Sequence, residues 1–170
     1  MSGRKHLVRS VIVDAPQETV FAALVDWETQ GAWMLGTSVR AEGAAHGVGG
    51  RLAAFTGVGR VGFLDTMEVV EWEPPRLVRV RHTGHVVRGD GVFEVLALPE
   101  GRSRFVWREE LELPLGALGR AGYALVRPAF AAGVDRSLRR FAALVACGEL
   151  GAGPAPEPPH GVGPAGAHGG

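Results

Sequence analysis

The sequence is poor in cysteine, and its single thiol, Cys147, excludes an internal disulfide and any metal site built from several cysteines. This scarcity is typical of a reducing compartment, so we expect a cytoplasmic protein. Long apolar runs are also missing. None approaches the ~20 residues that cross a bilayer, and the segment from Met1 to Lys5 lacks the apolar stretch of a secretion signal. We therefore expect no stable membrane insertion.

Net charge is absent as well. The chain has 18 Lys and Arg residues against 18 Asp and Glu residues, and its arginines are spread along the sequence. A nucleic-acid-binding protein normally concentrates its basic residues in one patch, so nucleic acid is disfavoured as a partner. The hydrophobic content of 46% is that of an ordinary globular protein.

The chain divides into a foldable part and a tail. Residues 1–150 are enough to bury one hydrophobic core. Residues 151–170 consist almost entirely of Gly, Pro, Ala and His, with Glu157 as their one charge. This composition has no periodicity and little to bury, which predicts a disordered tail.

Within the foldable part, a change of hydrophobic period separates helices from strands. Asp14 can cap a first short helix, with Gln17 at capping-box spacing, and a second short helix is expected over 26–33. Period-two alternation bounded by Gly or Pro-Pro predicts strands. The predicted strands are 7–13, 37–42, 50–56, 62–72, 77–83, 86–98 and 103–113. A long helix is predicted over 115–150, with apolar residues at intervals of three and four and a kink at Pro128.

This order of elements predicts an α+β fold. Short turns join consecutive strands, so these strands must pair antiparallel. The only long amphipathic element that can cover one face of the sheet is the C-terminal helix. A strongly twisted sheet that wraps around one helix leaves space between the two layers. We therefore expect an internal cavity that holds a small, largely apolar molecule.

Strand alternation assigns side chains to the cavity face. Three of these side chains can ionise, namely Asp65, His82 and Glu109. The other residues expected to contact a ligand are Phe63, Met67, Val80, Phe93 and Trp107 on the strands and Tyr123, Arg127 and Phe130 on the helix. A bulge near Glu71 would bring Trp72 back to the interior.

The three ionisable residues allow several interpretations. Asp65 or Glu109 can pair with Arg127 or His82 in a satisfied buried network, or they can contact a ligand without chemistry. The third interpretation is general acid/base catalysis, with His82 as base or acid and a carboxylate as its partner. A metal site formed by His82 and His85 with one carboxylate lacks a recognised ligand spacing, so we expect no metal.

No cofactor motif is present. Residues 57–62, GVGRVG, match the glycine spacing of a dinucleotide-binding loop. That loop must open a helix, whereas Phe63 to Trp72 is predicted as a strand. We therefore expect a hairpin at the rim of the cavity and no bound cofactor.

Six segments carry a resemblance to a known family. They are SVIVDAPQETVFAAL at 10–24, DWETQGAW at 26–33, DTMEVVEWEPPRLV at 65–78, VRGDGVFEV at 87–95, FVWREELELPLG at 105–116 and VRPAFAAGVDRSLRRF at 126–141. They are similar to the START/Bet v1-like (SRPBCC) superfamily, in particular to its bacterial polyketide cyclase/dehydrase and lipid-transport branch. The resemblance covers residues 6–148.

The resemblance implies the helix-grip fold, a seven-stranded curved antiparallel sheet around a long C-terminal helix, with two short helices after the first strand. It implies a carrier of a lipid- or polyketide-like molecule or, alternatively, a polyketide cyclase or dehydratase that uses acid and base residues in the same cavity. A third class, an interaction protein that activates a chaperone, is disfavoured because the strand signatures of that subfamily are missing.

Overall fold

The computed structural model describes residues 4–43, 45–84, 87–112 and 116–152, with side chains described for the same ranges except 4–5 and 116–126. Residues 153–170 of the predicted tail therefore lie outside the described residues. The elements are β1 (Arg4–Val13), α1 (Gln17–Val25), the 3-10 helix η1 (Trp27–Ala32), β2 (Thr37–Glu42), β3 (Arg51–Val58), β4 (Val61–Glu73), β5 (Leu77–His82), β6 (Arg88–Leu98), the 3-10 turn η2 (Pro99–Gly101), β7 (Arg102–Glu112) and α2 (Gly116–Ala146).

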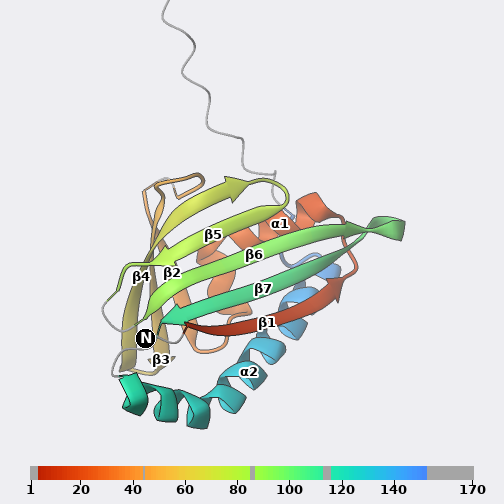
Figure 1. Cartoon of the computed structure of the whole chain (residues 1–170). Coiled ribbons are helices and arrows are strands. Elements are labelled where there is room, and N and C mark those ends of the chain that lie inside the picture. Colours follow the sequence, from red (N-terminus) through yellow and green to blue (C-terminus); the bar gives the residue numbers. More distant parts are fainter. Residues whose placement is uncertain (1–3, 44, 85–86, 113–115, 153–170) are drawn as a thin grey trace, which may run out of the picture.

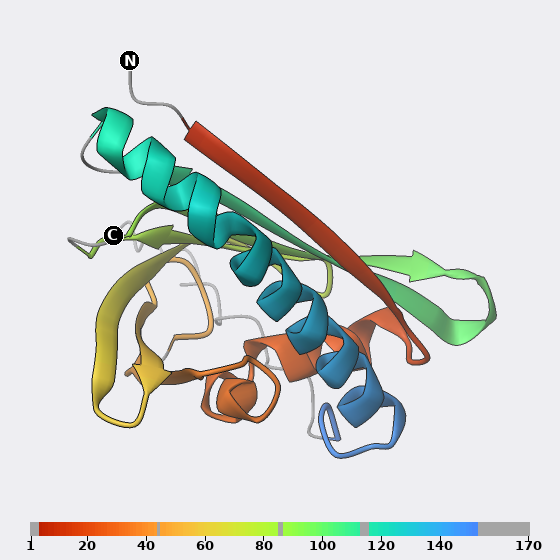
Figure 2. The ribbon, with the colours of Figure 1, turned by 90° about the horizontal axis from the view of Figure 1, so that it is seen from below.

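The seven strands form one antiparallel sheet in the order β1-β7-β6-β5-β4-β3-β2 (Figure 1). The first strand pairs with the last, and every other strand lies beside its neighbour in sequence, as short hairpin connections require. Figure 2 shows β3 and β4 turning away from the plane of β5–β7, so the sheet curves around the space beside α2. The α+β helix-grip architecture predicted from the sequence is confirmed.

A bulge in β4 accompanies this curvature. The pairing of β4 with β5 shifts register between Val69 and Glu71, where the sequence predicts a bulge. Trp72 is thereby returned to the inner side, where its ring meets Phe21 of α1 edge-on at 5.6 Å between centroids. The bulge therefore keeps the apolar residues of a long strand on the core side of a bent sheet.

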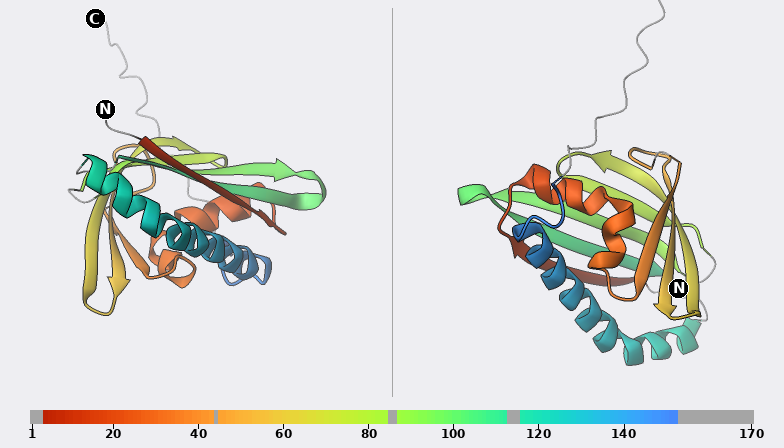
Figure 3. Two further views of the ribbon diagram at one scale, coloured as in Figure 1. Left: turned by 60° about the horizontal axis from the view of Figure 1, so that its bottom comes forward. Right: turned by 180° about the vertical axis from the view of Figure 1, so that it is seen from behind.

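Helix α2 packs tightly over its C-terminal half. Val134, Leu138, Phe141 and Val145 are spaced three and four residues apart and are at most 4% exposed. Residues 127–130, in contrast, are all exposed, whichever side of the helix they occupy. Pro128 lacks the amide hydrogen needed for the helical bond, and Figure 3 shows α2 bending in its first half. The helix thus stands clear of the core around Pro128.

The aromatic core centres on Trp33, which follows η1. Its indole has ring partners at centroid distances of 4.9–6.4 Å, and these partners are Phe93, Phe105, Trp107 and Phe141. They belong to β6, β7 and α2, so one side chain links the sheet to the C-terminal half of the helix.

The start of α1 departs from the sequence prediction. Pro16 is its N-cap residue, and no side chain caps the helix. Gln17 instead donates its Nε2–H to the carbonyl oxygen of Val95 in β6 at 2.7 Å. The predicted capping role of Asp14 and Gln17 is wrong because the sheet takes the Gln17 amide. The end of α2 also differs, since it stops at Ala146, before Gly148 adopts a left-handed φ of 80°.

Candidate functional site

A cavity of about 270 Å³ lies between the curved sheet and α2. On the helix it is lined by Phe130, Gly133, Val134 and Ser137, which share one helical face. The opposite wall is mainly apolar and includes Met34, Val39, Leu52, Ala54, Phe63, Met67, Val80, Phe93, Trp107 and Leu111. The predicted space between sheet and helix is therefore present in the described structure.

The cavity opens to solvent at a partly apolar rim. Leu35, Phe63 and Phe130 all line the cavity and remain 41%, 37% and 37% exposed. They come from the turn before β2, from the β3–β4 hairpin and from the loosely packed turn of α2. The predicted hairpin at 57–62 is confirmed, with Val58 opposite Val61, so these glycines form a turn and no cofactor loop.

Three ionisable side chains stand together in this apolar wall. Asp65 comes from β4, His82 from β5 and Glu109 from β7, and all three line the cavity. The side chains of His82, Asp65 and Glu109 are only 9%, 8% and 10% exposed. Strand alternation had placed these three residues on the inner face, and the sheet brings them into one cluster, called the acidic–His cluster below.

Two glycines make the cluster possible. Strand β6 separates β5 from β7, and His82 and Glu109 lie on a diagonal across it, because Glu109 is opposite Gly91 and Gly91 is opposite Val80, two residues before His82. Gly91 therefore lies beside the path between the two side chains, and a Cβ there would come within 3.4 Å of both Glu109 carboxylate oxygens. A Cβ at Gly84 would come within 3.0 Å of Asp65 Oδ1. The missing side chains give both carboxylates room to turn toward His82.

The cluster has two short hydrogen bonds and one longer ion-pair contact. His82 Nδ1 lies 2.6 Å from Asp65 Oδ2, whereas His82 Nε2 lies 3.4 Å from Glu109 Oε2 without a hydrogen bond. The indole of Trp107 donates its Nε1–H to Glu109 Oε1 at 2.6 Å. Each carboxylate is therefore oriented through one oxygen, Asp65 by the imidazole and Glu109 by the indole.

The imidazole of His82 is held in its charged form. Burial alone would lower the pKa of His82, but its hydrogen bond to Asp65, its 3.4 Å contact with Glu109 and the negative charge of both carboxylates raise this pKa to about 10. At neutral pH the ring is therefore an imidazolium that carries a hydrogen on both nitrogens.

One oxygen or nitrogen of each member has no hydrogen-bond partner within the described protein. These atoms are Asp65 Oδ1, His82 Nε2 and Glu109 Oε2, and all three are buried. Buried polar atoms in folded proteins normally have a partner. Trp33 Nε1 and Arg102 Nε also lack one, but the other three such atoms of the described residues lie together in one cluster. The cluster is therefore an ion-paired network in which each of the three side chains still has one buried polar atom without a hydrogen bond.

The remaining residues singled out from the sequence have different positions. Phe63, Met67, Val80, Phe93, Trp107 and Phe130 line the cavity. Arg127 is exposed and is absent from the described lining. Of the two partners considered for Asp65 and Glu109, Arg127 and His82, the structure pairs them with His82. The side chain of Tyr123 lies outside the described residues.

Sequence reasoning missed part of the lining. Trp27, Gln30 and Leu35 belong to η1 and the turn after it, where no simple period assigns a face. Gly133 was also missed, although a glycine within a helix is disfavoured by about 1 kcal/mol relative to alanine and signals a packing reason.

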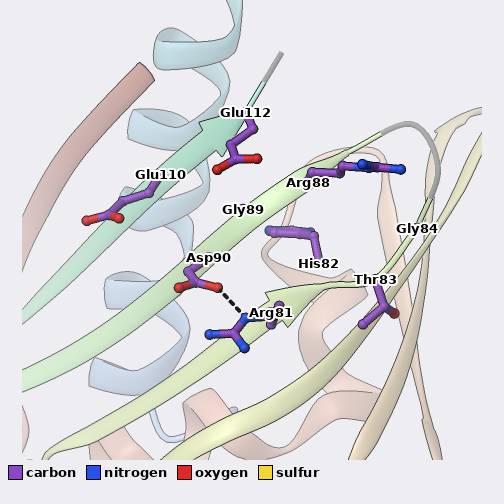
Figure 4. Close-up of a pocket in the computed structure, with 9 residues that line it drawn as sticks. All are labelled: Arg81, His82, Thr83, Gly84, Arg88, Gly89, Asp90, Glu110 and Glu112. Carbon is purple, nitrogen blue, oxygen red and sulfur yellow. Dashed lines mark hydrogen bonds and ion pairs between the residues drawn. The ribbon is translucent and has the colours of Figure 1, made fainter. Parts of the chain in front are cut away.

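A second, polar pocket of about 380 Å³ lies at the ends of β5, β6 and β7. Figure 4 shows its charged side chains, among which Arg81 donates to Asp90 at 3.1 Å. Arg81 is 59% exposed in its side chain, so this pair is solvated and contributes little. We therefore place the candidate ligand site in the apolar cavity.

The described residues contain neither a metal-binding group nor a membrane-spanning helix. Within them, no group of three or more His, Cys, Asp and Glu side chains could hold a metal ion. His85, which the sequence offered for a metal site, lies outside the described residues. Among the helices of the described part, none is long and apolar enough to cross a membrane.

Comparison with known proteins places the chain in a family. The family model for polyketide cyclase/dehydrase and lipid transport matches residues 4–146. The chain belongs to this family. The match spans every strand and all of α2, so the cavity and the acidic–His cluster lie inside the family domain. No curated protein matches the chain.

Solved structures share the fold at low sequence identity. TTHA0849 from Thermus thermophilus is 20% identical, with a TM-score of 0.69 over 84% of this chain and 98% of that one. The Zhui aromatase/cyclase from a Streptomyces species is 16% identical, with a TM-score of 0.68 over 84% and 94%. The di-domain aromatase/cyclase StfQ of the steffimycin biosynthetic pathway is 12% identical, with a TM-score of 0.65 over 82% and 50%.

Proposed function

We propose that this protein binds a small, largely apolar molecule in the cavity between its sheet and α2 and acts as a carrier for it. The observation that carries the proposal is an apolar cavity of about 270 Å³ with a partly exposed rim. This volume is close to the lower end of the ~300–1,000 Å³ typical of ligand sites. A ligand of one or two rings fits better than a long acyl chain. Nucleic acid and stable membrane insertion have no part in this function.

The carrier proposal is tested with a neutral fluorescent probe. N-phenyl-1-naphthylamine should bind the purified protein with a rise in fluorescence, because the cavity wall is apolar. Gly133→Leu places a side chain in the cavity and should weaken this binding by about tenfold or more. Ala132→Leu, on the exposed side of the same helical turn, is the matched control and should leave it unchanged.

Two results would overturn the proposal. One is no binding of the probe by the parent chain, and the other is equal loss of binding in both leucine variants. Native mass spectrometry of the protein as purified supplies an independent readout, since a co-purifying small molecule would identify the ligand directly.

A second candidate function is a polyketide cyclase or dehydratase. The observation that favours it is the pairing of an imidazolium with two carboxylates inside the cavity. In a dehydration, His82 would give a proton to the departing hydroxyl as the C–O bond breaks. Glu109 or Asp65 would take the proton from the neighbouring carbon, and the electrons of that C–H bond would form the C=C bond. The products are an alkene and water.

The two functions differ in the effect of one substitution. If the protein is an enzyme, His82→Ala should lower turnover by roughly 10²–10⁴-fold with little change in ligand affinity. If it is a carrier, the same change should alter affinity by about 0.5–1.5 kcal/mol, the effect of one hydrogen bond. Conversion of a bound ligand by the parent chain that survives His82→Ala would exclude His82 as the catalytic acid.

A further inference from the structure

The unsatisfied atoms of the acidic–His cluster indicate which polar group an otherwise apolar ligand carries. This inference rests on the proposed ligand-binding function and names the chemical group that the cavity recognises. His82 Nε2 and Glu109 Oε2 are 3.4 Å apart, both are buried, and neither has a hydrogen-bond partner. One is a donor and the other an acceptor, because Nδ1 of the charged ring already serves Asp65.

Gly91 leaves this donor–acceptor pair without a covering side chain. A Cβ at this position would lie only 3.3 Å from Val80 Cγ2 and 3.4 Å from both Glu109 carboxylate oxygens, so any side chain there would crowd the pair. His82, Gly91 and Glu109 all line the cavity, so a small polar group of a ligand can approach the pair from this side when the two side chains turn toward it. The pair forms a polar spot in an otherwise mainly apolar wall.

The charge around this spot disfavours anions. With His82 as imidazolium, the cluster has one positive and two negative formal charges. Among the lining residues that the structure describes, none is Lys or Arg. A carboxylate placed here would face two like charges at low dielectric, where repulsion is stronger than in water.

The number of hydrogen-bond donors and acceptors distinguishes the ligand groups that are not anionic. A ketone can accept from Nε2 but offers nothing to Glu109, and an ammonium group can donate to Glu109 but faces the imidazolium unpaired. A hydroxyl group does both, since it accepts through its oxygen and donates through its hydrogen. It satisfies two orphaned atoms at once.

We propose that the cavity recognises an uncharged apolar molecule through a single hydroxyl group, phenolic or alcoholic, and discriminates against the corresponding carboxylate. The hydroxyl lies to one side of His82 Nε2 and Glu109 Oε2, toward the cavity, and bonds to both. The apolar body of the ligand occupies the space toward Met67, Phe93 and α2.

Three probes with one carbon skeleton test this recognition. Naphthalene, 2-naphthol and 2-naphthoate are titrated against the parent chain at pH 7, by calorimetry or by displacement of N-phenyl-1-naphthylamine. We expect 2-naphthol to bind about tenfold more tightly than naphthalene, the effect of one hydrogen bond to a charged group. We expect 2-naphthoate to bind at least about tenfold more weakly than 2-naphthol.

The outcomes separate this inference from the proposed function. Naphthalene binding as tightly as 2-naphthol, or 2-naphthoate binding as tightly as either, would overturn hydroxyl recognition and leave the apolar cavity intact. Failure of all three probes, together with failure of the neutral dye, would overturn both.

A charge-removing pair of variants locates the selectivity. Glu109→Gln keeps the size of the side chain and removes one negative charge, so the preference for 2-naphthol over 2-naphthoate should shrink by about tenfold. Glu110→Gln removes the same charge from the neighbouring residue, which lines the outer polar pocket, and should leave the preference unchanged. Equal effects of the two variants would show that the selectivity arises outside the cavity.

Discussion

The glycine at position 133 of α2 allows a direct test of the cavity. Gly133 lies on the face of α2 that lines the cavity, and a Cβ built there meets nothing within 4 Å. Its φ is not left-handed, so alanine fits the backbone. Gly133→Ala should therefore add a methyl group to empty space and remove the conformational cost of a helical glycine.

The expected gain follows from helix propensity. Alanine is favoured over glycine in a helix interior by about 0.5–1 kcal/mol. For a domain of this size, 1 kcal/mol shifts the melting temperature by roughly 2–4 °C, so Gly133→Ala should raise it by about 1–4 °C. Ala132→Gly at the adjacent exposed position calibrates the propensity effect and should lower it by a similar amount.

Differential scanning calorimetry on the parent, Gly133→Ala and Ala132→Gly measures the three melting temperatures. A fall in melting temperature for Gly133→Ala, with the expected fall for Ala132→Gly, would mean that the methyl group meets packed atoms. In that case the cavity would not extend to Gly133 of α2. A higher melting temperature for Gly133→Ala, together with retained dye binding, supports an open cavity that tolerates one methyl group.

Three further predictions concern the cluster, the core and the tail. The raised pKa of His82 contributes stability that is complete below about pH 6.5 and is lost as the pH rises through about 10. The difference in unfolding free energy between the parent and His82→Gln, measured by urea denaturation, should therefore decrease across that range, and a constant difference would contradict the charged imidazole. Phe141→Ala removes a fully buried ring beneath Trp33 and should cost about 3–5 kcal/mol in the same assay. Deletion of 153–170 should leave the melting temperature unchanged, and a drop of more than ~4 °C would reveal that the tail docks on the domain.

The inner face of the sheet was predictable because strands repeat every two residues. That parity placed Asp65, His82 and Glu109 on one face, and the bulge at Glu71 kept Trp72 on it. Parity alone could not show that the three would meet. Their contact depends on strand order and on Gly91, which clears the path across β6.

The helical side of the site was harder to predict. Spacing by three and four residues put Arg127 on the same stripe as Phe130, yet the kink at Pro128 lifts this turn away from the core and leaves Arg127 exposed. The capping role assigned to Gln17 failed for a similar reason, since a contact with β6 outweighs a local signal. Local patterns describe a regular helix, whereas the cavity exists where α2 departs from regular packing.

The acidic–His cluster is an unfavourable arrangement for a protein that needs only a stable core. Moving a charged group out of water costs several kcal/mol even after relaxation, and well-packed apolar residues of similar volume are often as stable as a buried ion pair. Each buried polar atom left without a partner adds about 1–3 kcal/mol, and His82 Nε2 and Glu109 Oε2 are two such atoms. Their 3.4 Å ion-pair contact offsets part of this cost, and a ligand that supplies the missing hydrogen bonds would offset more. The cluster therefore makes better physical sense as part of a ligand site than as a structural ion pair.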